Sequence, residues 1–356
     1  MNKKTILIIA IFLLLFPVSA FAWNSLWYYT HEALADDAIH VFTQAEYPDL
    51  YKFEEKLRDG SESESPHPGN IYNGGNAEDW WKEKALMSYK AFKFSGAYAQ
   101  IGEVAHLTQD QAVPAHAANI KHGPYALHLD NFEGDADNNY VKNPTNGYSY
   151  SLPFQYYQPL QNDTRAKLST WKKSSTEQYW KPATNAPLDA TGGDQTNAPW
   201  GSYGGAENND VYDVKNDTQG IIASQVYMAA RYTAGVFAAA SKNLPPLVKD
   251  LQITSSSNCN NVPTIGKQTS AQISFKILEN RKKTVKIFIT VDGAAIINSE
   301  YGTGKSFDLS SGSDLPWEDT YTISWDGKLA SGQYPSDGEH TLYVTQCEVT
   351  SHFCEK

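Results

Sequence analysis

A short segment in the first third of the chain carries two histidines and a carboxylate at spacings suited to metal binding. His106 and Asp110 are four residues apart within a helical pattern, so their side chains are expected on one face of a helix. Pro114 should end or bend that helix just before His116, which can then approach from another direction. The segment predicts a metal site, against the alternative of an amphipathic helix with histidines that are close by chance.

Histidines are concentrated in the N-terminal part of the chain, whereas cysteines are not. Seven of the nine histidines lie there, at positions 31, 40, 67, 106, 116, 122 and 128. The three cysteines, Cys259, Cys347 and Cys354, all lie near the C-terminal end. A zinc ion in the N-terminal part would therefore use nitrogen and oxygen ligands, which suits a catalytic site better than a closed structural one. His40 and His122 are expected to be ordinary residues.

Helices are expected to position these groups. A helix with a Thr30 cap places His31 at its start, and a second helix spans about residues 44–57 before Arg58-Asp59-Gly60 interrupts it. Residues 61–75 read as a loop that carries His67. Residues 77–108 form one or two buried helices ending in the His106 segment. Two further helices are expected near residues 164–179 and 218–242, with long surface loops in much of 138–216.

The pattern changes after Pro245-Pro246, where a second domain is expected to begin. Segments 284–291, 321–325 and 341–345 alternate between apolar and polar residues and predict a small antiparallel sandwich. The stretch that begins Trp325-Asp326-Gly327 resembles the immunoglobulin-like domains appended to many exported bacterial proteins, which are usually spacers or adhesive modules. Cys347 could pair with Cys354 across a short loop in an oxidising compartment. No catalysis is expected in this domain.

The first 22 residues have the anatomy of a cleaved signal peptide. Two lysines precede an apolar run at residues 6–16 and a small-residue site, Ala20-Phe21-Ala22. Cleavage after Ala22 makes Trp23 the new N-terminus; cleavage after Ala20 is a weaker alternative. No later run is apolar enough to span a bilayer. The mature protein is expected to be secreted or periplasmic.

The chain is acidic, which argues against some partners. It has 29 basic and 40 acidic residues and a formal charge of −11. Removal of Lys3 and Lys4 with the signal leaves 27 basic against 40 acidic residues and a charge of −13. Such a chain is a poor electrostatic partner for nucleic acid or an anionic membrane, although it can bind cationic metals.

These motifs resemble the zinc-dependent phospholipases C and the related single-strand-specific zinc nucleases. The resemblance covers roughly residues 23–242 in layout and depends on two features. The first is His106-x-x-x-Asp110 followed by Pro114-x-His116-Ala-Ala-Asn119, which is similar to the family's central signature. The second is Trp23 directly after the cleavage site, because the mature N-terminal tryptophan of the family gives its amino group and carbonyl to zinc.

The resemblance implies three zinc ions, with Asp110 as a ligand shared by two of them. The first would be held by Asp59, His67, His106 and Asp110. The second would be held by Trp23, His31 and Asp110. The third would be held by His116, His128 and Glu133. The spacing of His128 and Glu133 differs by one residue from the family pattern, so Asp130 or His122 is an alternative ligand. By resemblance, Asp59 would also accept a proton from the attacking water.

The expected architecture is an all-α zinc phospholipase C-like domain at residues 23–245, followed by an all-β immunoglobulin-like sandwich at 246–356. The favoured activity is hydrolysis of a phospholipid headgroup to diacylglycerol and a phosphorylated alcohol, with transient membrane contact and no stable protein partner. One alternative is a zinc nuclease that uses the same metals; the negative charge disfavours it. The other is a metal-bound but catalytically silent surface or adhesion protein.

Overall fold

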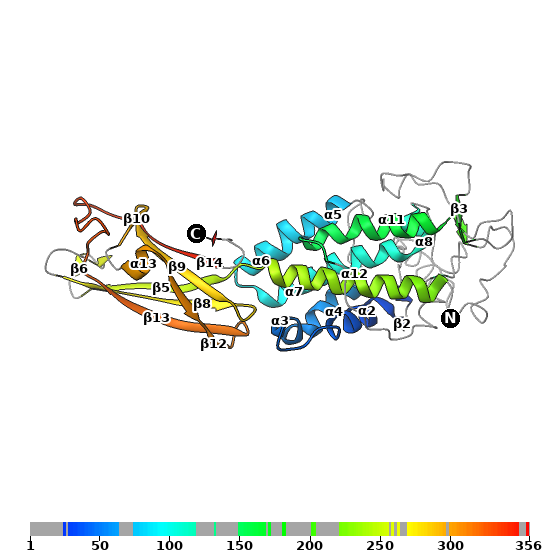
Figure 1. Ribbon diagram of the computed structural model, residues 1–356, viewed down its shortest axis with the longest axis horizontal. Helices are drawn as coiled ribbons and strands as arrows, with labels where there is room; N and C mark the ends of the chain where they lie inside the picture. The colour runs from blue at the N-terminus through cyan, green and yellow to red at the C-terminus, as the bar shows by residue number, and fades with distance from the viewer. Residues whose placement is uncertain are drawn as a thin grey trace, which may run out of the picture. The chain divides into compact units, whose positions relative to one another are not determined.

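The computed structural model describes two sets of elements, helical in the N-terminal part of the chain and stranded in the C-terminal part (Figure 1). The described residues are 24–25, 28–63, 74–118, 132, 149–168, 170–171, 180–182, 201–203, 221–255, 258–259, 262–263, 269–296, 299–348 and 354–355. Contacts divide the chain into two compact units. The first, the helical unit, comprises Met1–Val41, Glu54–Met87 and Ser95–Ala239, and the second, the sandwich unit, comprises Phe42–Phe53, Ser88–Phe94 and Ala240–Lys356.

The N-terminal part contains the expected helices with altered ends. The first group is α2 (Thr30–Ile39), α3 (Pro48–Lys52), α4 (Glu54–Glu62), α5 (Gly74–Asp79), the π-helical η1 (Trp80–Ala85) and α6 (Leu86–Lys90). The second group is α7 (Phe94–Gln109), η2 (Asp110–Ala112), α8 (Pro114–Ala117), η3 (Pro153–Tyr156), α11 (Tyr157–Leu168) and α12 (Ile221–Asn243). Short strand pairs are β1 (Asn24–Ser25) with β2 (Tyr28–Tyr29), and β3 (Trp180–Pro182) with β4 (Gly201–Tyr203).

The expected helix break at Pro114 is confirmed. Val113, which precedes the proline, is extended with φ −72° and ψ 121°, and Pro114 then opens α8. The helix expected at residues 164–179 is α11, which begins seven residues earlier and ends at Leu168, and the expected helix at 218–242 corresponds to α12. Lys167 of α11 donates to Ser224 of α12, and Tyr232 of α12 donates to Asp163 of α11. These bonds place α11 and α12 side by side (Figure 1).

The interruption expected at Arg58-Asp59-Gly60 is wrong, because these residues lie inside α4. A Cβ atom on Gly60 would come within 1.8 Å of the Ala99 carbonyl oxygen, and one on Gly102 within 2.3 Å of the Leu57 carbonyl oxygen. The two glycines therefore allow α4 and α7 to cross with their backbones almost in contact. Gly60 serves helix packing rather than a turn, so the helix continues past the Asp-Gly pair to Glu62.

The C-terminal part forms two antiparallel sheets. The four-stranded sheet has the order β12 (Ser310–Ser311), β13 (Trp317–Trp325), β8 (Ala271–Glu279), β5 (Leu247–Ser255). The other has the order β10 (Ala294–Ala295), β9 (Thr284–Val291), β14 (Leu342–Glu348), β15 (Cys354–Glu355), with β11 (Lys305–Asp308) also paired to β9. The C-terminal part also contains a short helix, α13 (Ser299–Gly302), and a separate strand pair, β6 (Asn258–Cys259) with β7 (Val262–Pro263). The expected strand at 284–291 coincides with β9.

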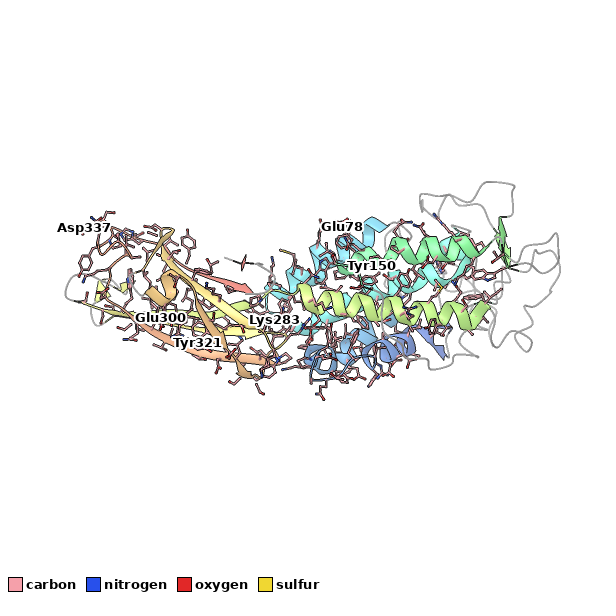
Figure 2. All side chains as sticks on the ribbon, viewed as in Figure 1. Glu78, Tyr150, Lys283, Glu300, Tyr321 and Asp337 are labelled. Atoms are coloured by element: carbon pink, nitrogen blue, oxygen red, sulfur yellow. The ribbon has the colours of Figure 1, made fainter. Side chains whose placement is uncertain are left out.

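The two sheets enclose one apolar core, so they form a sandwich. Alternate residues point inward from β8 (Ile273, Phe275, Ile277) and from β9 (Val285, Ile287, Ile289, Val291), as the period of two in the sequence requires. Figure 2 labels Tyr321 on β13, which packs against this core, and Lys283 in the turn between β8 and β9. Cys347 and Cys354 lie opposite each other in the register of β14 and β15, and their disulfide stays a prediction.

The Trp-Asp-Gly motif has a structural role in the sandwich unit. The Trp325 side chain is buried and its indole nitrogen donates to the Lys328 carbonyl oxygen at 2.8 Å. Asp326 accepts from the Lys328 backbone amide at 3.1 Å, and Gly327 has a φ of +84°, which favours glycine. The motif therefore closes a turn at the end of β13.

A buried polar network joins an N-terminal segment to the sandwich unit. Asp49 of α3 is fully buried; one carboxylate oxygen accepts from Ser241 Oγ at 2.9 Å and the other from Asn280 Nδ2 at 2.8 Å. The same Asn280 nitrogen lies 2.9 Å from the Ser241 carbonyl oxygen. Because a buried carboxylate needs such donors, the network explains how residues 42–53 are held in a unit made mostly of strands.

None of the helices that the structure describes combines the length and the apolar character needed to cross a bilayer.

Candidate metal centre

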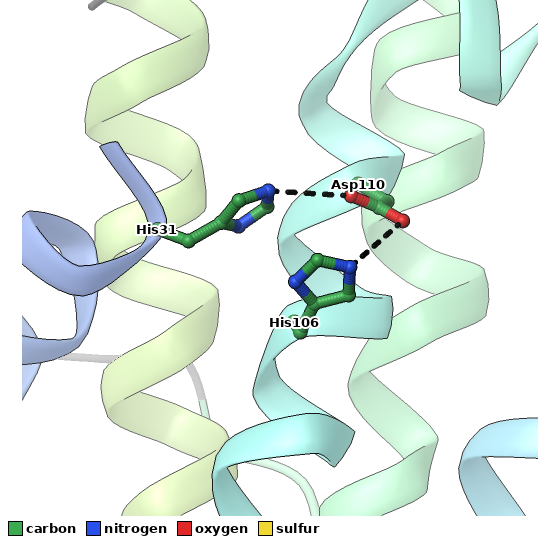
Figure 3. A group of neighbouring side chains, drawn as sticks. All are labelled: His31, His106 and Asp110. Carbon is green, nitrogen blue, oxygen red and sulfur yellow. Dashed lines mark ion pairs between the residues drawn. The ribbon is translucent and has the colours of Figure 1, made fainter. Parts of the chain in front are cut away.

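Three of the expected ligands converge inside the helical unit. His31 comes from the first turn of α2, His106 from the last turn of α7 and Asp110 from the start of η2. Their candidate ligand atoms lie within 4.8 Å of one another, and all three side chains are about 1% exposed. Figure 3 shows both imidazoles turned toward the carboxylate. We refer to these residues as the buried triad.

The hydrogen bond of His106 determines which ring nitrogen carries the proton and which one is directed at Asp110. His106 Nδ1 lies 2.8 Å from the Ser61 carbonyl oxygen. A carbonyl oxygen can only accept, so Nδ1 carries the proton, and Nε2 of the neutral ring carries a lone pair. That nitrogen is 3.7 Å from Asp110 Oδ2, which is longer than a hydrogen bond. The two atoms therefore face each other without a hydrogen bond between them.

His31 is arranged in the same way by the side chain of Gln109. His31 Nδ1 lies 2.5 Å from Gln109 Oε1, while Gln109 Nε2 donates to Thr233 Oγ1 of α12 at 3.1 Å. The Ser61 hydroxyl lies 3.0 Å from Gln109 Oε1 and 3.0 Å from the His31 carbonyl oxygen. With the amide in this orientation, His31 donates from Nδ1 and turns Nε2 toward Asp110 Oδ1, 3.6 Å away.

The Asp110 carboxylate is buried and receives no hydrogen bond from the part of the chain that the structure describes. Among the residues that the structure describes, neither carboxylate oxygen accepts a hydrogen bond, although the side chain is about 1% exposed. Burial raises the pKa of Asp110 well above its ordinary value. A buried carboxyl without donors costs free energy unless it is protonated or lies beside a cation.

The donor set fits a divalent metal, and zinc in particular. Two neutral imidazoles that each donate Nδ1–H to an oxygen are the ligand form that zinc binds, with an outer partner that fixes ring orientation. Each Asp110 oxygen faces a different histidine.

His116 is also buried but does not belong to the buried triad. It is 0% exposed on α8, after the break at Pro114. The resemblance implies a separate metal for His116. The break at Pro114 places this side chain on α8 rather than on α7, which carries His106. The partners expected for it, His128 and Glu133, lie outside the described residues, as do the alternatives Asp130 and His122. Trp23 and His67 lie outside them too.

The structure does not bring Asp59 to the buried triad. Its side chain is 53% exposed, and its carboxylate lies 2.6 Å from Lys56 Nζ on the same helix. The reason is the α4–α7 crossing: Gly60 faces α7, and its neighbour Asp59 is rotated about 100° around the helix, toward solvent. Ser61, one residue after the glycine, faces the histidines instead.

Three residues beside the buried triad were not predicted from the sequence. They are Ser61, Gln109 and Thr233, which form hydrogen bonds with the histidines or with each other. No spacing pattern in the sequence marks them.

A second group of potential ligands lies near the surface of the helical unit. It consists of Asp36, His40 and Glu54. His40 Nδ1 is 2.8 Å from the Asp36 carbonyl oxygen, and the Arg58 guanidinium lies 3.9 Å from Glu54. These side chains are partly exposed and a cation already lies beside them, so the group differs from the buried triad, where no donor reaches the carboxylate among the described residues.

A buried carboxyl on α7 gives a pH-dependent prediction. Glu103 is 8% exposed, and burial raises its pKa to about 7. The native state therefore holds a proton that the unfolded state, with a pKa near the ordinary 4.5, has lost. The unfolding free energy of the wild type should therefore fall by about 3 kcal/mol as the pH rises from 4.5 through 7. Glutamine cannot lose a proton, so Glu103→Gln should not show this fall.

Urea unfolding of both proteins at several pH values, in chelator, checks this. The stability of Glu103→Gln relative to the wild type should rise between pH 4 and pH 8. A constant difference across that range would show that Glu103 titrates normally.

Comparisons with known proteins add a resemblance in solved structures only. No protein-family model matches the chain, and no curated protein matches it. Among solved structures, the alpha toxin of Clostridium absonum has 12% identity and a TM-score of 0.36, over 90% of this chain and 88% of that one. The alpha-toxin of an avian strain of Clostridium perfringens has 11% identity and the same TM-score and coverage. At this TM-score the similarity carries no argument about function. The function is therefore argued from the geometry of the buried triad.

Proposed function

We propose that this protein is an exported zinc-dependent phosphodiester hydrolase of the phospholipase C class. The proposed substrate is a phospholipid, which would be cleaved to diacylglycerol and a phosphorylated alcohol. The observation that carries the proposal is the buried triad, in which His31 and His106 lie beside a buried carboxylate that accepts no hydrogen bond from the described residues. The sequence resemblance supplies the substrate class and the expectation of three zinc ions.

The residues of the triad perform distinct tasks in this proposal. Bound zinc would supply Lewis acidity and lower the pKa of a water molecule toward neutrality. His31 and His106 would each hold a zinc ion through Nε2, because Gln109 and Ser61 accept from their Nδ1 atoms. Asp110 would provide the negative charge and, by its two oxygens, join neighbouring ions. The acidic chain can bind an anionic phosphodiester at such a site because the metals bring the positive charge.

The test combines metal analysis with two substrates. The mature protein should contain zinc, hydrolyse phosphatidylcholine vesicles, lose that activity in a chelator and recover it when zinc is added. Single-stranded DNA is the second substrate and should be cleaved much more slowly. Hydrolysis of DNA alone would identify the nuclease alternative, and zinc binding with neither activity would contradict the enzyme proposal.

A further inference from the structure

We propose that the sandwich unit carries a separate binding site for phosphate monoesters of polyols. The site is a hollow of about 280 Å³ lined by Lys282, Lys283, Thr284, Asp308, Leu309 and Trp317. It shares no residue with the buried triad and does not depend on the hydrolase function. Its volume suits a small sugar or glycerol phosphate rather than a polymer.

Two cations from one turn border the hollow. Lys283 Nζ lies 3.5 Å from Glu279 Oε1 and its side chain is 6% exposed, so this cation is held in place by a buried carboxylate. Lys282 Nζ lies 5.5 Å from the centre of the Trp317 ring, within the range of a cation–π contact. Lys282 forms no ion pair within the described part of the chain, which leaves its charge available to an anionic ligand.

Trp317 brings a hydrogen-bond donor that needs an acceptor. Its indole Nε1 is buried and has no acceptor among the described residues. An indole nitrogen can only donate, and buried donors are normally paired. Trp317 packs against the sandwich core, so its ring cannot turn away without loss of packing. A phosphate oxygen in the hollow would accept from this N–H beside the lysines, as charge-assisted hydrogen bonds favour.

Asp308 restricts the class of anion. Asp308 is one of the residues that line the hollow; its carboxylate repels a bare anion nearby but can accept a hydrogen bond from a hydroxyl group. A phosphate attached to a polyol satisfies both ends: its phosphate group meets Lys282 and Trp317, and a hydroxyl meets Asp308. Glycerol 3-phosphate and a phosphoinositide headgroup share this chemistry, and the first is the soluble probe.

The experiment follows the indole N–H signals of the zinc-free full-length mature protein by NMR. Trp317→Phe identifies the Trp317 signal by its loss and keeps an aromatic ring in the core. Titration with glycerol 3-phosphate at constant ionic strength should shift that signal saturably, and Lys282→Gln should weaken binding by about three- to tenfold. The absence of a saturable shift, or equal affinity in Lys282→Gln, would overturn the proposal.

Two further arms define the ligand. Asp308→Asn should tighten binding of inorganic phosphate by about threefold and weaken the preference for glycerol 3-phosphate; an unchanged preference would remove the polyol from the proposal. Vesicles with phosphatidylinositol 4-phosphate distinguish the source. If Trp317→Phe lowers vesicle binding, the natural ligand is a lipid headgroup; if only glycerol 3-phosphate responds, it is a soluble phosphate ester.

Discussion

Replacement of Asp110 by asparagine is expected to remove zinc from the buried triad. Asparagine has nearly the same shape but neither the charge nor the second acceptor oxygen that a shared ligand needs. The loss in zinc affinity should exceed the 10- to 100-fold that is typical of outer partners of metal ligands, since Asp110 would contact the metal itself. Hydrolysis of phosphatidylcholine should fall to background with it.

Zinc content after dialysis and equilibrium unfolding with and without zinc measure this effect. Zinc should stabilise the wild type by about 2.7 kcal/mol when its free concentration is a hundred times the dissociation constant, and should stabilise Asp110→Asn less. The zinc-free variant should be at least as stable as the zinc-free wild type, because the buried carboxyl has a raised pKa. Asp79→Asn, the same change at an exposed residue of α5, is the control. Full zinc content in Asp110→Asn would refute the role given to this carboxylate.

Replacement of Gln109 by leucine is expected to weaken zinc binding without removing a ligand. Gln109 Oε1 is the acceptor for His31 Nδ1, so leucine leaves that nitrogen without a partner and no longer favours the tautomer with Nε2 toward Asp110. The expected loss is 10- to 100-fold in zinc affinity, the range known for outer partners of metal-bound histidines.

Gln109→Glu is the matched variant. A carboxylate accepts from His31 and from Ser61 as the amide oxygen does, and Thr233 can donate to it. Zinc affinity should therefore be retained in Gln109→Glu and reduced in Gln109→Leu, although both lose the amide donor to Thr233. Competition with a chelator of known affinity gives both values. Equal losses in the two variants would mean that Gln109 acts only through packing.

Much of the fold follows from local patterns in the sequence. The period of two in residues 284–291 gives β9 with its correct ends, and the alanine-rich segment gives α12. The error at Gly60 has a physical cause: an Asp-Gly pair favours a turn locally, but the contact with Ala99, 39 positions away in sequence, determines that the glycine is helical. Crossings of this kind depend on distant partners and leave no local signal.

The site residues also fall into two classes: those that local spacing predicts and those that depend on contacts between distant segments. The four-residue spacing placed His106 and Asp110 on one face of a helix, and the structure confirms that they meet. His31 was expected from the family resemblance alone, since nothing in its local pattern relates it to α7. Asp59 was expected by the same route, and the geometry of α4 directs it away. Ser61 and Gln109 are common polar residues whose roles arise only when α2, α4 and α7 are brought together.

Anomalous diffraction at the zinc absorption edge tests the central claim most directly. Crystals of the mature protein, purified without chelator and equilibrated with zinc, should show an anomalous peak within bonding distance of an Asp110 oxygen and of Nε2 of His31 or His106. The same peak should be absent from Asp110→Asn. Wild-type crystals with Asp110 hydrogen-bonded to protein or water, and no anomalous peak beside it, would contradict the account.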